Sequence, residues 1–563
     1  MAETGAITKP RGGRTTVALA YPNTYYVGMS NLGFQTVYRI INARPDALAE
    51  RVFLPDDIDI EHFSRPGTPL TAMESQTPAR EFEILAFSVS FENDYVNVAE
   101  MLRLSGIPPY AGSRGEGFPL VIMGGIAAFF NPEPIAPFFD AVIAGEAEDV
   151  LGEFLDSYEA DKLNLSRVDL LKKLSRIPGV YVPSLYTPSY NEDGTLASFT
   201  PVPGAPERII RRQIADLDRH PTHSVILTPD TEFGGMFMTE LARGCGRHCR
   251  FCMAGYIYRP PRNRGVESVK ADIALGRTLT EKVGLVGSAV SDYPDIGLLA
   301  EAFREAGIDF SASSMRADSL TPEAVALLAK GNRTVAIAPE AGSERMRGVI
   351  NKNISEEQIL NAVRMLISGG ILNVRLYFMV GLPTETDEDV EAIIDLAKKA
   401  RDVQLAEARK LGRLGQLTLS VNCFIPKPWT PFQWEAMEPE KSLNAKLAHI
   451  KKSLKSVPNV NVIHDSPRSA WLQDTLSRGD RRLADVILAA ADSGGDWKKA
   501  FRDAGLDMAF YTGRERGELE LFPWDFIDTG IMKGYLWSER ERSRDAKHTP
   551  PCRVGKCRIC GVC

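Results

Sequence analysis

Two groups of cysteines carry the most specific chemical signal in this chain. The first group is Cys245, Cys249 and Cys252, with the aromatic Phe251 immediately before the third cysteine. The second group crowds the last twelve residues and consists of Cys552, Cys557, Cys560 and Cys563. A secreted disulfide framework spreads its cysteines through a short chain, whereas tight groups in a long chain are typical of metal or cluster ligands.

The first group has the spacing C-x3-C-x2-C. Three thiolates on one short loop can hold three irons of a cubane [4Fe–4S] cluster and leave the fourth iron open, which makes such a cluster reactive. A structural zinc loop is the alternative. Because three cysteines suffice as ligands, we expect His248 to lie beside the cluster, and we expect the isolated Cys423 to be a small core residue.

The second group supplies four thiolates, which can close a tetrahedral zinc site or a complete cubane cluster. Its spacing suits both, and we favour a second iron–sulfur cluster over zinc and over a metal-free tail. Residues 529–563 contain eight Lys or Arg and three acidic residues. This local charge leaves open either contact with RNA phosphates or an ordinary solvated surface.

The composition is that of a globular protein, with 44% apolar and 25% charged residues. With 66 basic and 73 acidic residues the net charge is −7, which implies no general attraction to nucleic acid or to membranes. No apolar stretch approaches the length of a membrane span, and Met1 to Arg14 lack the apolar core of a secretory signal. We therefore predict a cytoplasmic protein without a membrane partner.

Ahead of the first cysteine group, apolar runs alternate with helical patterns, which is typical of a parallel sheet with crossover helices. Gly33 and the pair Gly124, Gly125 stand at turns after strands, where the backbone must approach closely. We predict an α/β fold that begins with a doubly wound parallel sheet over residues 1–160 and continues into a β-rich connector over 161–234. The expected strands of the sheet are Thr16–Tyr21, Phe82–Ser90, Leu120–Gly124 and Asp140–Gly145.

Six further strand-like runs follow, each with a helical pattern behind it: Phe237–Arg243, Val283–Ser288, Phe310–Met315, Thr334–Pro339, Val374–Val380 and Leu417–Phe424. Six such units predict a partial (β/α)6 barrel over residues 235–435, with the active site at the carboxyl ends of the strands. Residues 436–545 are predicted to form a small, mainly helical region. Residues 546–563 form the cysteine-rich tail.

The first cysteine group, placed after the first barrel strand, resembles the cluster loop of the radical SAM superfamily. The resemblance implies that the open iron binds S-adenosylmethionine (SAM), and that electron transfer from the cluster splits SAM to give a 5′-deoxyadenosyl radical. It also implies that SAM lies near Phe251 and near residues at the ends of the following strands. Those residues are Gly287, Ser288, Ser311, Ser313, Arg316, Glu340 and Gly381, and Tyr258 is a candidate for substrate or SAM contact.

The N-terminal domain resembles the cobalamin-binding domain of one class of radical SAM enzymes. The resemblance implies cobalamin contacts at Ser30, Gly33, Ser88, Ser90, Gly124 and Gly125. The family pattern has Asp and a cobalt-ligating His where this chain has Gly28 and Ser30. Cobalamin would therefore be held without histidine ligation.

The predicted function is that of a radical SAM enzyme that methylates an unactivated carbon with the help of cobalamin. The resemblance implies a reductase or a flavodoxin- or ferredoxin-type protein as electron donor. The substrate class stays open between a small molecule, RNA and protein. The alternatives are methylthiolation, rearrangement or oxidation without methyl transfer and, from another class, a non-catalytic iron–sulfur electron carrier.

Overall fold

The computed structural model describes residues 2–63, 65, 67–312 and 315–563. Its N-terminal part is a six-stranded sheet in the order β2-β1-β3-β4-β5-β6, in which only β6 runs antiparallel to its neighbour. The order reverses between β1 and β3, so the sheet is doubly wound and has its ligand-binding switch point there. The strands are β1 (Thr15–Tyr21), β2 (Ala47–Phe53), β3 (Ile84–Ser88), β4 (Leu120–Gly124), β5 (Ala141–Ile143) and β6 (Val180–Tyr181).

Strand β2 is absent from the strands predicted from the sequence, because charged residues interrupt its apolar pattern. Arg51 is nevertheless fully buried in this strand. Its guanidinium forms ion pairs of 2.7 Å with both Glu3 and Glu74. A buried charge is tolerated when it is paired in this way, and the partners come from distant parts of the chain.

The second sheet is the wall of a partial barrel. A three-stranded part in the order β10-β13-β14 meets a four-stranded part in the order β15-β16-β17-β18 through a parallel bridge between Met315 and Ile337. All these neighbours run parallel. The strands are β10 (Phe237–Glu240), β13 (Lys282–Val286), β14 (Asp309–Ala312), β15 (Thr334–Glu340), β16 (Asn373–Val380), β17 (Leu417–Cys423) and β18 (Val460–Ile463).

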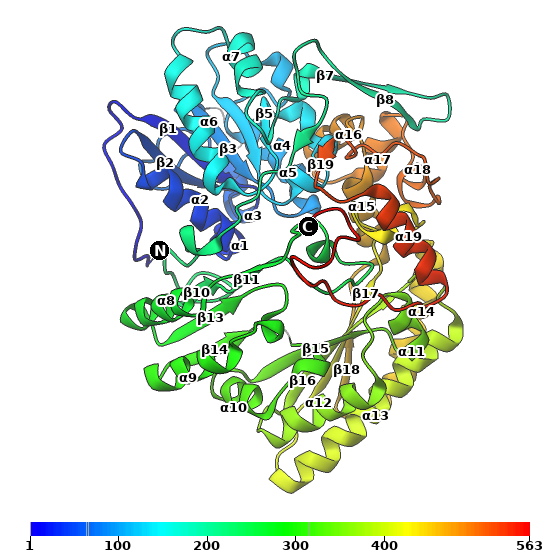
Figure 1. Ribbon diagram of the computed structural model, residues 1–563. Coiled ribbons are helices and arrows are strands. Elements are labelled where there is room, and N and C mark those ends of the chain that lie inside the picture. Colours follow the sequence, from blue (N-terminus) through cyan, green and yellow to red (C-terminus); the bar gives the residue numbers. More distant parts are fainter. Residues whose placement is uncertain (1, 64, 66, 313–314) are drawn as a thin grey trace.

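The helices α8 (Val266–Leu279), α9 (Ile296–Ala306), α10 (Pro322–Gly331), α12 (Glu356–Ser368), α13 (Asp387–Leu411) and α14 (Glu440–Leu454) cover the outer face of this wall (Figure 1). Strand β16 shows how the sequence pattern fits this layer. Val374, Leu376, Phe378 and Val380 belong to the buried core, while the residues between them stay partly exposed. The α/β class and the barrel are confirmed.

Two strands come from segments predicted to lie outside the sheets. Strand β6 falls in the predicted connector and pairs with β5, and β18 falls in the predicted helical region and pairs with β17. Each is short, so its periodicity is too weak to identify it, and pairing with a preformed sheet edge stabilises it. The domain limits remain our prediction.

The helices that follow β18 connect the N-terminal domain with the barrel (Figure 1). The first of them contacts α14, and its Ala470 belongs to the barrel core. Val486 and Ile487 of α16 share one buried core with the first sheet, and α16 lies against α4 (Tyr95–Leu104). The helices are α15 (Pro467–Arg478), α16 (Leu483–Asp492), α17 (Trp497–Asp503), α18 (Met508–Thr512) and α19 (Lys533–Arg544). None of the described helices combines the length and apolarity that a bilayer span requires.

Candidate functional site

The cluster loop, residues 244–261, leaves the first barrel strand and folds back on itself. At its base, β11 (Ala242–Arg243) pairs antiparallel with β12 (Arg262–Asn263). Gly244 has φ +81°, and a Cβ there would lie 2.6 Å from the Tyr258 carbonyl oxygen, so only glycine fits. The Cys245 amide donates to the Ala254 carbonyl at 3.1 Å. The three thiols of the first group therefore stand on one compact loop.

Burial makes these thiols hard to ionise without a positive partner. It raises the pKa of Cys252 to about 12 and also raises the pKa of Cys245, and the neighbouring Cys249 thiol adds to both shifts. Arg316 and Lys352 act in the opposite direction on Cys245 and Cys252, respectively. A bound metal deprotonates a coordinating thiol outright. Three close thiols with two nearby cations fit an iron–sulfur cluster.

No three Cys, His or acidic side chains of the described part converge at the spacing of a single bound ion. A cubane cluster binds each cysteine at a different iron, so its ligands are more widely spaced than those of one ion.

Ion pairs from successive barrel loops surround the cluster loop. Arg247 makes a bidentate pair with Asp292 at 2.8 and 2.9 Å. Arg316 makes a second with Asp318, both contacts being 2.9 Å. The third is a 3.2 Å pair between Lys352 and Glu340. The charge of Cys249 raises the pKa of both Arg316 and Lys352, which places these cations at the cysteines.

The sequence identified Arg316 and Glu340 as site residues but missed Asp292, Asp318 and Lys352. Glu340 ends β15 with φ +69°, a left-handed conformation that non-glycine residues rarely adopt. That strain could not be seen in the sequence. Lys352 follows the short helix α11 (Glu344–Val349), and no spacing rule links it to the end of a strand.

Three of the other predicted SAM residues lie at the carboxyl ends of barrel strands. Gly287 follows β13 and faces the Ala242 backbone, where a Cβ would lie 3.6 Å from the carbonyl oxygen. Ser288 is exposed in the next turn. Gly381 follows β16 with φ +82°, and its amide donates to the Glu385 carboxylate at 2.9 Å.

Phe251 packs on a small apolar cluster formed at the ends of β15, β16 and β17, which includes Ala341, Leu382 and Phe424.

The Ser311 side chain contacts the amino end of the sheet. Its hydroxyl donates to the Asn332 side-chain oxygen at 3.3 Å, and Asn332 precedes β15 at the amino end of the sheet. The structure therefore does not bring the Ser311 hydroxyl to the cluster loop. Ser313 lies outside the described residues.

Tyr258 joins the cluster loop to the N-terminal domain. Its ring meets Phe129 edge-on with centroids 5.5 Å apart, and burial raises the pKa of its hydroxyl to about 12. Phe129 lies on α5 (Ala127–Phe130), directly after the glycine pair that ends β4. The cluster loop thus contacts the carboxyl edge of the first sheet.

Two further contacts hold the carboxyl edges of the two sheets together. Lys427, which follows β17, pairs with Glu92, which follows β3, at 2.6 Å. The Trp429 indole donates to the Phe130 carbonyl at 3.1 Å. The ligand-binding edge of the N-terminal domain therefore faces the mouth of the barrel.

The predicted cobalamin residues lie along this edge. The Ser30 hydroxyl donates to the Tyr26 carbonyl at 2.6 Å and accepts from the Glu232 amide at 2.9 Å, so it is not free to act as a cobalt ligand. The Asn31 side chain donates to Ser90 at 3.2 Å, which links the ends of β1 and β3 across the switch point. Ser88 is buried at the end of β3.

The glycines of this edge differ in their surroundings. Gly125 has φ +91°, and a Cβ there would lie 2.5 Å from the Val89 carbonyl oxygen. A Cβ on Gly124 would meet no atom within 4 Å, so space is open beside it. Gly33 lies in the first turn of α2 (Leu32–Ala43). A Cβ on Gly33 would lie 3.2 Å from the Asn31 side-chain oxygen.

Large apolar side chains stay exposed around the same edge. Four of them are Tyr26 and Val27 of α1 (Tyr25–Met29), Phe91 after β3, and Phe233 in the connector. The side chains of all four are exposed. Tyr26 donates to Glu232 at 3.0 Å, which places it beside Phe233. An apolar surface with open space at Gly124 fits the flat face of a corrin ring, without a protein ligand to cobalt.

The cysteine-rich tail lies against the cluster loop. The Cys552 amide donates to the Gly246 carbonyl at 2.7 Å. Asn351 bridges the two segments, because its amide donates to the His248 and Thr549 carbonyls at 3.0 Å each. In Figure 1 the red end of the chain accordingly runs between the two domains.

A buried cation connects the two cysteine groups. Arg259 is 1% exposed, donates to the His248 ring at 3.0 Å, and hydrogen-bonds the Cys560 thiol, which raises the arginine pKa. Its Nη1 is buried and has no hydrogen-bond partner among the residues that the structure describes. A buried guanidinium with an unused donor beside a thiol fits an anionic metal–thiolate group in the tail.

His248 is neutral in this setting. Burial and the adjacent Arg259 and Arg250 lower its pKa to about 3, and its Nδ1 lies 2.6 Å from the Tyr535 hydroxyl of α19. Its ring thus contacts Arg259 and Tyr535. Cys423 belongs to the barrel core, and burial raises its pKa to about 12.

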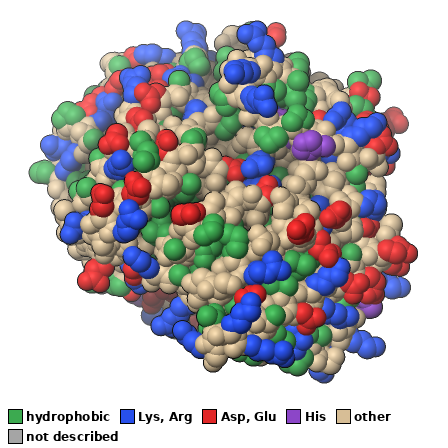
Figure 2. Space-filling model, turned by 60° about the horizontal axis from the view of Figure 1, so that its bottom comes forward, with side chains coloured by type: hydrophobic (Ala, Val, Ile, Leu, Met, Phe, Trp, Pro, Cys, Tyr) green, Lys and Arg blue, Asp and Glu red, His purple; other side chains and the backbone are tan. Residues whose placement is uncertain are grey.

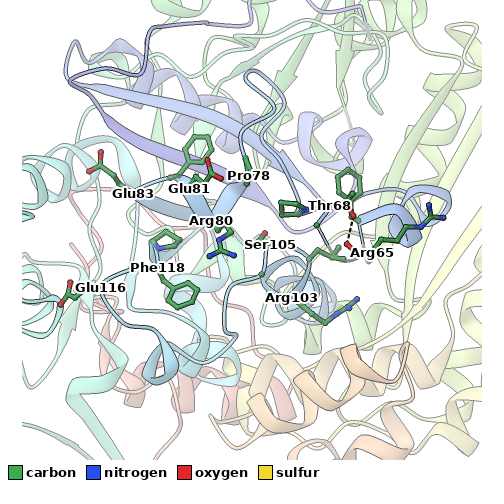
Figure 3. Close-up of a pocket in the computed structure, with 18 of the residues that line it drawn as sticks. Arg65, Thr68, Pro78, Arg80, Glu81, Glu83, Arg103, Ser105, Glu116 and Phe118 are labelled. Carbon is green, nitrogen blue, oxygen red and sulfur yellow. Dashed lines mark hydrogen bonds between the residues drawn. The ribbon is translucent and has the colours of Figure 1, made fainter.

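A cleft of about 1070 Å³ lies elsewhere, at the amino edge of the first sheet (Figure 3). Arg65, Arg80, Glu81, Arg103 and Phe118 are among its lining residues. The starts of β3 and β4 border it, so it lies at the opposite edge from the cluster loop. We place the chemistry at the cysteines and not in this cleft.

Comparisons with known proteins show what this chain is similar to. Residues 33–183 match the family described as Radical SAM proteins, N-terminal, and residues 239–397 match the Radical SAM superfamily. The chain is 32% identical over 482 residues to the uncharacterized protein MJ0966 of Methanocaldococcus jannaschii, which covers 84% of this chain and 90% of that protein.

A second relative is an uncharacterized methyltransferase of Pyrococcus horikoshii, 27% identical over 308 residues that cover 51% of this chain and 59% of that protein. A solved structure of the cobalamin-dependent SAM radical enzyme OxsB aligns with a TM-score of 0.46 and 15% identity, over 71% of this chain and 56% of that one.

Proposed function

Because this chain belongs to the radical SAM superfamily, we propose that it transfers a methyl group to an unactivated carbon with cobalamin bound at its N-terminal domain. One observation carries the proposal: the ligand edge of the first sheet is held against the barrel mouth, within contact of the cluster loop, by the Lys427–Glu92 pair and the Tyr258–Phe129 contact. A methyl carrier on that edge would lie next to a radical made in the barrel.

Cys245, Cys249 and Cys252 would hold the [4Fe–4S] cluster. When bound, the cluster supplies the electron that splits SAM into methionine and a 5′-deoxyadenosyl radical. The residues of this chain then have binding and positioning tasks. We assign Glu340 to the amino group and Arg316 to the carboxylate of SAM, since opposite charges stabilise both groups in a partly buried site. Lys352 positions Glu340 through its 3.2 Å ion pair.

Apolar and backbone groups would hold the remainder of SAM. Phe251, Gly287, Ser288 and Gly381 lie on the cluster loop and at the ends of barrel strands, where an adenosine group can be enclosed between them. The Ser311 hydroxyl, which bonds Asn332, is not assigned to SAM, whereas Ser313 keeps its predicted role as part of this proposal. Tyr258 keeps its proton at neutral pH and acts by packing.

At the N-terminal edge, Gly124 would leave room for the corrin ring, and Tyr26 and Phe91 would pack on its apolar face. Ser30, Gly33, Ser88, Ser90 and Gly125 shape the edge through backbone and hydrogen-bond geometry. Cobalt would take no ligand from the protein there.

The tail cysteines Cys552, Cys557, Cys560 and Cys563 would bind a second iron–sulfur cluster, next to Arg259. Its buried guanidinium offers the unused donor to the anionic group. A flavodoxin- or ferredoxin-type protein would supply the electrons.

The test is an anaerobic incubation of reconstituted protein with SAM, hydroxocobalamin and a low-potential reductant. We expect both 5′-deoxyadenosine and S-adenosylhomocysteine, and neither from Cys249→Ala. 5′-Deoxyadenosine without S-adenosylhomocysteine would refute methyl transfer while keeping the radical enzyme.

Cobalamin binding is tested separately by absorption spectroscopy. Gly124→Phe fills the open space and should abolish retention of hydroxocobalamin on gel filtration. The matched control is Gly297→Phe on α9, where a Cβ also meets nothing within 4 Å. Equal retention by both variants would place cobalamin elsewhere or exclude it.

Methylthiolation is the second candidate, because the tail cysteines adjoin the cluster loop and could supply a sulfur-bearing cluster there. A tRNA-2-methylthio-N(6)-dimethylallyladenosine synthase of Pelotomaculum thermopropionicum is 30% identical over 172 residues, which cover 28% of this chain and 38% of that protein. Transfer of labelled sulfur from the reconstituted protein to product would favour this candidate, and transfer of the methyl group alone would exclude it.

A further inference from the structure

The tail differs in charge from the rest of the molecule. The whole chain has a net charge of −7, yet residues 546–563 contain no Asp or Glu. Arg553, Lys556 and Arg558 stand between the tail cysteines, and all three are exposed. Within the described part of the chain, none of these three side chains forms an ion pair or a hydrogen bond.

Apolar side chains lie between the cations. Val554 is 54% exposed and Ile559 is 50% exposed, so the tail presents two isolated apolar groups together with its three positive charges. Cys560 is buried beneath them at 1% exposure. We define the basic tail face as Arg553, Val554, Lys556, Arg558 and Ile559.

The cations of the basic tail face are distinct from the cation that contacts a tail thiol. Arg259 is buried and hydrogen-bonds the buried Cys560 thiol, whereas the three cations of the basic tail face are exposed. The exposed cations remain available to a partner.

The tail also offers a short route to the first cluster loop. Cys552 is hydrogen-bonded to Gly246 at 2.7 Å, and Arg259 contacts both the Cys560 thiol and the His248 ring. His248 lies next to Cys249 in the chain. A group bound by the tail thiols would therefore lie between solvent and the cluster loop.

We propose that the basic tail face is the docking site of an acidic one-electron carrier protein, and that electrons enter the enzyme through the tail thiol site. The inference rests on the proposed second cluster. Cys552, Cys557, Cys560 and Cys563 would hold the group that receives one electron from the reduced carrier, and that electron would reach the cluster loop without a proton. It would be consumed when one carbon–sulfur bond of SAM breaks to give methionine and a carbon radical.

Size and charge favour a carrier over RNA. Three cations with two apolar side chains make a small patch, and electron-transfer encounters are among the smallest protein interfaces. RNA binding draws on many phosphate contacts along an extended basic surface. On the face shown in Figure 2, Lys and Arg side chains are mixed with Asp and Glu, and no such surface extends across it.

The test is the triple reversal Arg553→Glu, Lys556→Glu, Arg558→Glu in the full reconstituted protein. The probe is purified flavodoxin, an acidic flavin protein. We expect flavodoxin binding and the flavodoxin-driven rate of cluster reduction to fall about tenfold or more, because charge complementarity sets both encounter and affinity. Cluster reduction by dithionite, followed by electron paramagnetic resonance, should stay within about twofold.

The matched control reverses three exposed lysines of α14, Lys441→Glu, Lys451→Glu and Lys452→Glu, which changes the net charge equally. It should bind flavodoxin like the wild type. Raising the salt concentration should weaken wild-type binding and leave the tail variant nearly unaffected.

Unchanged flavodoxin binding and reduction in the tail variant would overturn the proposal. Loss of binding to a mixed-sequence single-stranded RNA, with flavodoxin binding intact, would overturn it in favour of RNA. Iron analysis tests the second cluster independently of docking. If Cys557→Ala holds as much iron as the wild type, the second cluster is refuted, and the charge-reversal experiment then tests docking alone.

Discussion

The contact between Lys427 and Glu92 allows a sharp test of how the two domains are held together. The ion pair is 2.6 Å long, with the lysine side chain 14% exposed and the glutamate side chain 4% exposed. Replacing Lys427 by Met keeps the apolar stem and removes the charge. Glu92 would then keep weaker polar contacts, among them the one from Gln473 at 3.3 Å.

The expected loss of unfolding free energy is about 3 kcal/mol, the lower end of the cost of leaving one buried charge unpaired, because Gln473 still donates. Glu92→Gln combined with Lys427→Met should recover most of this loss, since replacing both partners leaves no buried charge. Urea denaturation of the two single variants and the double variant gives the coupling energy directly.

The loss of unfolding free energy in Lys427→Met should depend on pH, whereas the loss from a packing defect would not. In the wild type, Lys427 overcomes the effect of burial and holds the pKa of Glu92 below its ordinary value. The pair therefore stabilises the fold above the unfolded pKa of Glu92, and this contribution disappears as pH falls through the lower folded pKa.

Without Lys427, burial raises the Glu92 pKa, and protonation relieves the unpaired charge. The deficit of Lys427→Met should therefore be largest near neutral pH and smaller at about pH 5. As a control, Lys410→Met removes an exposed pair with Glu407 and should cost less than about 0.5 kcal/mol. A deficit below about 1 kcal/mol, or one that is equal at both pH values, would refute the buried-pair argument.

Four other variants test the site and its surroundings. Gly125→Ala should lower the unfolding free energy by about 3 kcal/mol, because alanine is strained in the left-handed conformation and its Cβ would clash with Val89. In the same urea titration, Gly124→Ala should change the unfolding free energy by under about 0.5 kcal/mol. Burial raises the pKa of Asp94 to about 6, so Asp94→Asn should stabilise the protein by about 3 kcal/mol near pH 7 and by nothing below about pH 3. A pH-independent effect would contradict this. Cys423→Ala should leave the iron content per chain unchanged, because its thiol lies in the barrel core, and loss of iron would make it a ligand.

Local pattern was enough to identify the cluster loop and most of the strands. The spacing of Cys245, Cys249 and Cys252 places three thiols on one loop whatever the rest of the chain does. The apolar runs of β1, β4, β16 and β17 are long enough to identify strands buried in parallel sheets. Arg316, Glu340 and Gly381 are expected as site residues from the resemblance to the radical SAM superfamily, and they lie at or after the ends of β14, β15 and β16.

Contacts between distant segments could not be read from the sequence. Strand β2 contains Glu50 and Arg51, and its burial depends on Glu3 and Glu74. Lys352 reaches the cysteines only because α11 turns the chain back toward them.

The sequence by itself determined that this chain carries a three-thiol cluster loop at the start of a parallel barrel, because ligand spacing and strand periodicity are local properties. Only the tertiary structure decided that the first sheet faces the barrel mouth and that the tail lies on the cluster loop. Contacts such as Lys427–Glu92 and Cys552–Gly246 each join segments that lie hundreds of residues apart. The packing of the whole core sets which distant segments meet, so this choice leaves no periodic pattern in the sequence.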